Sequence, residues 1–160
     1  MSYYSDQRDE IKAQLEAVTG IGKVYTRQPN PTDEKSFKDA YVSSSKINSV
    51  IITRMDGSDN PENDALGSIS EANEIIATGK RDFWLIRLLY GYDDHATTPS
   101  EDTFQTLVDA IEEKFRYLEN LNNKAYFSYP LQRTQCGLFV FFNSYLCHKA
   151  EWRLQVVNRT

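Results

Sequence analysis

The sequence predicts an α+β fold, in which a mainly antiparallel sheet has two helices packed beside it and a long projecting hairpin arm. The 160 residues have the length of one ordinary domain, and 40% of them are hydrophobic, as in a globular protein. Apolar residues recur at helical spacing in 5–19 and 101–117, whereas strand-like apolar patterns fill four other segments: 47–54, 82–92, 138–142 and 145–157. We therefore expect one domain spanning residues 1–160, without internal repeats.

The N-terminal segment 5–19 predicts an amphipathic helix. Its apolar residues fall at i, i+4 and i+7: Ile11, Leu15 and Val18. Ser5 or Asp6 is suited to cap this helix, and Gly20 to end it in a left-handed conformation. A short strand is expected to start within residues 21–25.

Two strands and a loop are predicted for the next region. Residues 27–45 hold two prolines and few apolar residues, so we expect a loop, with one helical turn around 34–41 as the alternative. Residues 47–54 (INSVIITR) are rich in β-branched residues and predict a strand. Residues 82–92 (DFWLIRLLYGY) are apolar on both faces, which predicts a central strand covered on each side.

An extended acidic loop, at about residues 56–80, separates these two strands. Six acids and no Lys or Arg occur within residues 56–79: Asp56, Asp59, Glu62, Asp64, Glu71 and Glu74. A connection of this length in a small domain is usually functional or disordered. We expect a hairpin whose oversized tip projects from the domain, either as a solvated loop or as a contact surface.

Residues 101–117 predict the clearest helix of the chain. Its apolar stripe consists of Phe104, Leu107, Val108, Ile111 and Phe115. Ser100 is the expected cap, and Glu101 and Asp102 complement the positive end of the helix dipole. The opposite side is polar, so this helix is expected to cover one face of the sheet.

The last third of the chain predicts strands at 138–142 (LFVFF) and 145–157. In the second strand, alternate apolar residues point one way: Leu146, His148, Ala150, Trp152, Leu154 and Val156. Lys149, Glu151 and Arg153 point the other way. This second row is either a solvated outer face or a contact between subunits in which mixed charges fix the register.

Composition argues against several classes of function. The net charge of −5 gives the chain no general attraction for phosphate backbones, which disfavours nucleic-acid binding. No apolar run approaches the roughly 20 residues that span a bilayer, and residues 1–10 lack a signal-peptide pattern. We therefore expect a protein of the cytosol with no membrane contact, whose Cys136 and Cys147 stay reduced.

Chemistry-bearing residues form no recognisable active-site motif. Asp93, Asp94 and His95 are adjacent and rarely converge on one metal ion, so they predict a turn. Cys147 and His148 are neighbours in a strand and point to opposite faces, so His148 is expected to be a hydrogen-bonded core residue. We expect no catalytic, cofactor-binding or metal-binding residue. A small metal-dependent enzyme using these residues, and a generic adaptor or nucleic-acid-binding domain, remain the alternatives.

Several segments carry a resemblance in their order along the chain: VTGIGKVYTRQ, INSVIITR, RDFWLIRLLYGYDD, SEDTFQTLVDAIEEKFR and YLCHKAEWRLQVV. They resemble parts of the tail terminator (tail completion) proteins of long-tailed bacteriophages. The first segment resembles the passage from the first helix into the first strand, and the second and third together resemble the strand–arm–strand unit. The fourth resembles the long helix and the fifth the closing strand. Residues 27–45 and 56–80 match no pattern of that family.

The resemblance implies a structural protein of the virion tail and neck, assembled in the bacterial cytoplasm. Members of the family form a ring, usually a hexamer, that caps the tail tube, ends its elongation and joins it to the head connector. The implied partners are further copies of the chain, the tail tube protein and the connector or neck protein, while DNA passes through the lumen without sequence-specific binding. Another head–tail joining protein or a tube protein is the nearest alternative. Ring closure requires two different patches, for which the six acids of 56–79 and the row Lys149, Glu151 and Arg153 are the candidates.

Overall fold

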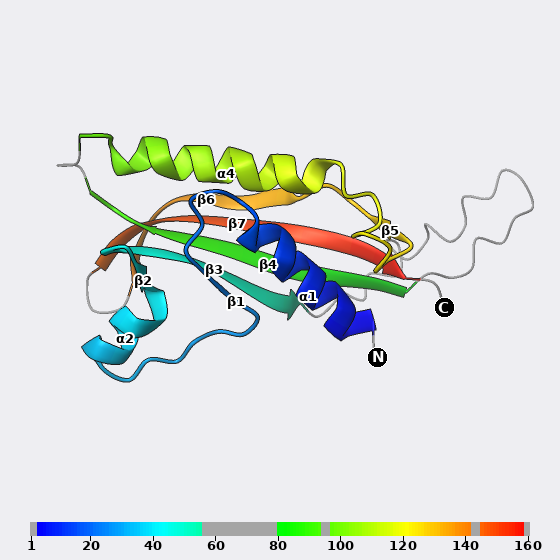
Figure 1. Ribbon diagram of the computed structural model, residues 1–160, viewed down its shortest axis with the longest axis horizontal. Helices are drawn as coiled ribbons and strands as arrows, with labels where there is room; N and C mark the ends of the chain where they lie inside the picture. Colours follow the sequence, from blue (N-terminus) through cyan, green and yellow to red (C-terminus); the bar gives the residue numbers. More distant parts are fainter. Residues whose placement is uncertain (1–2, 56–79, 94–96, 142–144, 159–160) are drawn as a thin grey trace, which may run out of the picture.

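A computed structural model describes residues 3–55, 80–93, 97–141 and 145–158 (Figure 1). The helices are α1 (Tyr3–Glu16), α2 (Glu34–Tyr41) and α4 (Ser100–Arg116). The strands are β1 (Lys23–Tyr25), β2 (Val42–Ser43), β3 (Lys46–Met55), β4 (Lys80–Gly91), β5 (Phe127–Ser128), β6 (Gln132–Phe141) and β7 (Tyr145–Asn158). The predicted α+β class is confirmed, with a third helix added to the two expected.

The strands form one mixed sheet in the order β1-β3-β4-β7-β5, with β2 beside β3 and β6 beside β7. Every pairing is antiparallel except that of β1 with β3. The central place predicted for residues 82–92 is confirmed, because β4 lies between β3 and β7. β3 and β4 pair as far as Met55 opposite Phe83, so the acidic segment does connect adjacent antiparallel strands. The arm itself, residues 56–79, lies outside the described residues.

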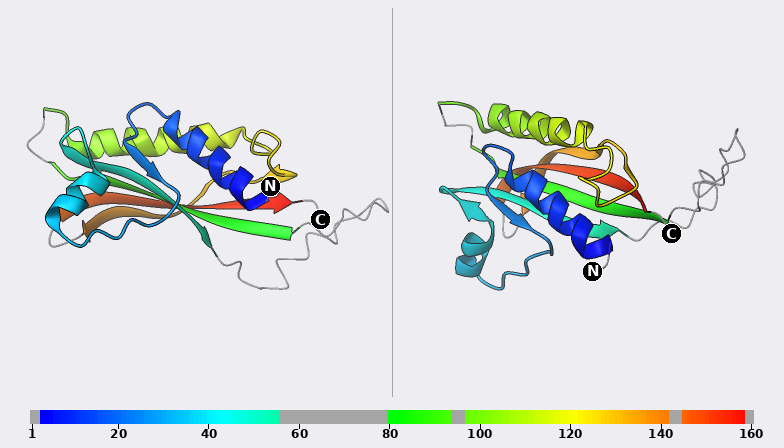
Figure 2. Two further views of the ribbon diagram at one scale, coloured as in Figure 1. Left: turned by 60° about the horizontal axis from the view of Figure 1, so that its bottom comes forward. Right: turned by 45° about the vertical axis from the view of Figure 1, so that its right-hand side comes forward.

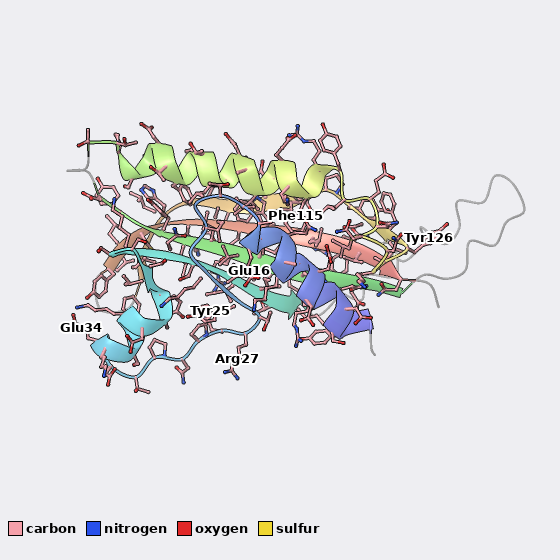
Figure 3. The ribbon with its side chains drawn as sticks, in the orientation of Figure 1. Glu16, Tyr25, Arg27, Glu34, Phe115 and Tyr126 are labelled. Carbon is pink, nitrogen blue, oxygen red and sulfur yellow. The ribbon has the colours of Figure 1, made fainter. Side chains whose placement is uncertain are left out.

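Helices α1 and α4 lie on the same face of the sheet (Figures 1 and 2). The predicted apolar stripes are confirmed, because Ile11 and Leu15 of α1 and all five stripe residues of α4 are buried there. Phe115 points from α4 toward the sheet (Figure 3). Gly20 has the positive φ that was expected, 91°, but α1 already ends at Glu16, and Ser5 and Asp6 lie inside α1 instead of capping it.

Helix α2 occupies part of the segment for which a loop was expected. Asp33 caps it by accepting a hydrogen bond from the Ser36 backbone N–H, and the Ser36 side chain accepts one from the Asp33 backbone. This capping box stabilises a two-turn helix that places Phe37 and Tyr41 against the sheet face opposite α1 and α4. The hydroxyl of Tyr25 donates to the carbonyl oxygen of Ala40, which attaches α2 to β1 (Figure 3). A single helical turn was therefore too short a prediction.

The alternation predicted for residues 145–157 is confirmed in β7. Ala150, Trp152, Leu154 and Val156 are buried on the face under α1 and α4, whereas Cys147 is buried on the other face beside α2. No helix among the described residues is long and apolar enough to cross a membrane. The sheet has one face covered by α1 and α4, except near β6 where Leu138 and Val140 are exposed, and one face covered by α2 at one end.

Candidate assembly surface

The face opposite α1 and α4 carries a group of charges that we call the charged patch: Arg87, Lys149, Glu151 and Arg153. Lys149, Glu151 and Arg153 occupy successive outward positions of β7, as the sequence predicts. Arg87 lies on β4 directly opposite Glu151. Two neighbouring central strands thus place three bases and one acid on a single surface.

Glu151 joins two of these bases. The Arg87 Nε donates to Glu151 Oε1 at 2.9 Å, and the Lys149 Nζ lies 3.4 Å from the same oxygen. The side chains of Lys149 and Glu151 are only 13% and 15% exposed. A fully solvated outer face is therefore not what the structure has, whereas a contact between subunits stays a prediction.

Arg153 differs from the other bases of the patch because no carboxylate among the described residues pairs with it. Its guanidinium carbon lies 3.8 Å from the centroid of the Phe83 ring, which it covers. Phe83 is consequently only 6% exposed although no helix lies over it among the described residues. The Arg153 Nε is buried and has no hydrogen-bond acceptor within the part of the chain that the structure describes. A buried donor without an acceptor is costly, so an added acceptor would be favourable here.

The charge balance of the patch is opposite to that of the whole chain. Three bases against one acid leave it with two positive charges in excess, whereas the chain carries a net charge of −5. The predicted acidic candidates Asp56, Asp59, Glu62, Asp64, Glu71 and Glu74 lie outside the described residues. A surface of this sign suits an acidic partner.

The ends of the strands that carry the acidic segment are held by polar contacts. The Asp82 carboxylate pairs with Arg54 and accepts a hydrogen bond from the Asn158 amide at 2.6 Å. Asn158 in turn accepts a hydrogen bond from Gln7 of α1. Asp82 and Asn158 are 8% and 4% exposed, so these contacts lie inside the domain. They attach the strands flanking 56–79 to α1 and to the end of β7.

His148 is a hydrogen-bonded core residue, as predicted. Its Nε2 lies 2.9 Å from Ser100 Oγ, and its ring stacks on Phe104 at 4.9 Å between centroids. Ser100 Oγ also accepts a hydrogen bond from the Asp93 backbone N–H, so the prediction that Ser100 caps α4 through its side chain is wrong. Burial lowers the pKa of His148 below its usual 6.5, although Glu101 opposes this. The contacts hold the start of α4 against β7.

The other candidates for chemistry are separated or lie outside the described residues. Cys147 faces away from His148, and burial raises the pKa of its thiol to about 11, which disfavours a nucleophilic thiolate. Asp93 pairs with Lys46 at 3.3 Å, while Asp94 and His95 are not among the described residues. Within the described ranges, no three His, Cys, Asp or Glu side chains gather as a metal site would require.

Comparison with known proteins identifies no relative: no family model matches the chain, and no curated protein matches it either.

Three features of the molecule were not predicted from the sequence. Arg87 is the only charge within the apolar run of residues 83–90. It lies three residues after Trp84 in the same strand, so the two side chains point to opposite faces and Arg87 faces away from the core. The stacking of Arg153 on Phe83 depends on the register between β4 and β7 and has no local signal. The third feature lies on the other face of the sheet, where the apolar run of β6 is exposed at Leu138 and Val140.

Proposed function

We propose that this chain is a structural subunit that closes into a ring on the end of a bacteriophage tail tube, ending elongation and joining the tube to the head connector. The observation that carries the proposal is the positively charged patch containing Arg153, in an acidic chain with a separate acidic segment. The order of segments along the sequence, which resembles the tail terminator family, is what directs this assembly to a phage tail.

The proposed contact is head to tail. The acidic segment 56–79 of one subunit lies against the charged patch of its neighbour, where a carboxylate accepts from the Arg153 guanidinium. Two different surfaces meet in such a contact, and a repeated rotation between subunits closes a ring. Charge-assisted hydrogen bonds to a partly buried guanidinium also fix the orientation of the two subunits.

The attached ends of the acidic segment support this arrangement. Asp82, Arg54 and Asn158 hold the strands on either side of it to the rest of the domain. A contact surface that begins from fixed strand ends loses less conformational freedom on binding than one on an unattached tail. The charge of −5 further suits a lumen through which DNA passes without binding, and a ring whose bore is lined with Lys and Arg would refute that part of the proposal.

The test is the mass of the purified protein by light scattering, alone and with purified tail tubes, together with negative-stain images. We expect a closed ring or density capping one end of each tube. Arg153→Glu and deletion of 57–79 should each abolish capping while leaving a folded subunit. Lys114→Glu makes the same charge change on α4, away from the patch, and should cap tubes normally.

Other results would redirect the proposal. Normal capping by both altered chains would remove the acidic segment and the charged patch from the interface. A chain that never associates with tubes would contradict the terminator function itself. Open-ended polymers, in contrast, would favour the tube-protein alternative, because a terminator stops growth and a tube subunit continues it.

A further inference from the structure

The strand β6 is a long free edge of the sheet. Nine of its ten residues pair with β7, and within the described residues β6 pairs with no other strand. The backbone groups on its outer side are therefore available to an incoming strand. Such an edge usually carries charges, prolines or a bulge that prevents association between chains.

The C-terminal part of β6 lacks these protections. A bulge interrupts the pairing between Arg133 and Gln135, but the register from Gln135 to Phe141 is regular. Residues 135–141 (QCGLFVF) contain no charge and no proline. The free edge therefore ends in seven uncharged residues that are suited to pair with another strand.

Apolar side chains are exposed along the same part of the edge. Leu138 and Val140 are 60% and 64% exposed, and they point to the same face as Leu146 and Tyr92, which are 37% and 41% exposed. The backbone N–H of Tyr92 donates to the carbonyl oxygen of Leu146, which places these two residues side by side. We call these four residues the edge patch. A strand added at this edge would place its own side chains beside Leu138 and Val140.

We propose that two copies of the chain associate through β6, edge to edge and antiparallel, about a two-fold axis at Leu138. The length of the edge points to a second copy as the occupant. On the opposite side of the described sheet, β1 has three residues and β2 has two, so neither matches a ten-residue edge. Within this chain the matching free edge is β6 itself.

The composition of 135–141 fits this pairing. Leu138 is the middle residue of the seven, so an axis there sets Cys136 opposite Val140 of the second copy and Leu138 opposite Leu138 of the second copy. No charge opposes a like charge in this register, and apolar residues face each other across the new pair. The two sheets become one continuous sheet with α1 and α4 of both copies on the same face.

This inference is independent of the proposed ring. A two-fold contact joins the same surface of two copies, whereas ring closure joins two different surfaces. Arg153 and the acidic segment take no part in the β6 pairing. Loss of one contact therefore leaves the other measurable.

The experiment compares Leu138→Lys, Leu138→Glu and an equal mixture of the two by light scattering over a range of protein concentrations. The unaltered chain should dimerise, and each variant alone should have a dimer dissociation constant raised at least about tenfold, because like charges meet at the axis. The mixture should regain dimers, since Lys then faces Glu. Tyr117→Lys is the matched control, because Tyr117 is 74% exposed but lies beyond α4, and it should dimerise normally.

A covalent test fixes the register. In a Cys136→Ser background, Leu138→Cys should form disulfide-linked dimers on mild oxidation, whereas Tyr117→Cys should not. An unaltered chain that stays monomeric at its highest soluble concentration overturns the proposal. So does a mixture of the Lys and Glu variants that fails to regain dimers. Arg153→Glu should leave the dimer intact, which separates failure of this contact from failure of the ring.

Discussion

The face of the sheet under α1 and α4 is covered by apolar side chains except at the edge patch, whereas the opposite face is apolar mainly at the end beneath α2. Both faces come from alternate residues of the same strands. In β7, Trp152 and Leu154 belong to the covered face, and Arg153 between them belongs to the charged patch. A single step along the chain thus changes a residue's surroundings from core to partly open surface.

The two faces are therefore expected to contribute differently to the stability of the fold and to association between chains. Burial of apolar area on the covered face supplies the main free energy of folding. Each ion pair of the opposite face contributes less, because the cost of removing two charges from water offsets most of their attraction. The charges of the open face are therefore available for association without a large effect on stability.

The largest expected effect is at Trp152, which is fully buried and donates its Nε1–H to Glu112 Oε1 at 2.8 Å. Trp152→Ala should lower the free energy of unfolding by about 3–5 kcal/mol, because it leaves a cavity in the core. Arg153→Ala, one residue along the same strand, should lower it by only about 1–2 kcal/mol, because it removes the cation–π contact that covers Phe83 but opens no enclosed cavity. Urea unfolding at one fixed protein concentration measures both.

If Trp152→Ala does not fold, Trp152→Phe gives the same comparison with a smaller cavity. An Arg153→Ala effect as large as that of the Trp152 substitution would contradict the division between the faces.

A smaller effect is expected from pH, through His148 on the covered face. Burial lowers the pKa of His148 in the folded chain, so the unfolded chain binds a proton more readily below about pH 6.5. The stability contributed by neutral His148 is complete above that pH and is lost as the pH falls toward the folded pKa. The slope cannot exceed about 1.4 kcal/mol per pH unit for one group.

Urea midpoints of the unaltered chain and of His148→Gln at pH 7.5 and pH 5.5 isolate this contribution. The unaltered chain should lose more stability between the two pH values than the variant does. Equal losses would mean that protonation of His148 is not linked to folding.

The covered face was largely predictable from the sequence, because burial imposes a periodic pattern. The stripe of α4 and the alternation of β7 both identify residues that the structure buries, Phe104 and Trp152 among them. Local capping chemistry was harder to predict. Ser100 has the residue type of a cap but bonds His148, which is 48 positions away, and α2 depends on a capping box at Asp33 and Ser36 within a proline-containing segment.

The candidate surface was predictable only in part, since it depends on contacts between strands. Alternation assigns Lys149, Glu151 and Arg153 to one face. It does not reveal that Arg87 lies opposite Glu151 or that Arg153 covers Phe83, because both follow from the β4–β7 register. The exposure of Leu138 and Val140 was also missed, since an apolar run is the same in sequence whether its strand is central or at an edge.

The smallest effect is expected at Arg87, the member of the charged patch on β4. Its side chain is 33% exposed, and Glu151 keeps Lys149 as a partner when Arg87 is removed. Arg87→Met keeps the apolar stem and removes the charge, so the free energy of unfolding should change by less than about 1 kcal/mol. Capping of tail tubes should weaken in the same variant, because the patch loses one of its two excess positive charges. Unfolding in urea and the capping assay, run on the same preparation, measure the two effects. A loss of several kcal/mol with normal capping would mean that Arg87 contributes to folding and not to association, which would contradict the division between the two faces.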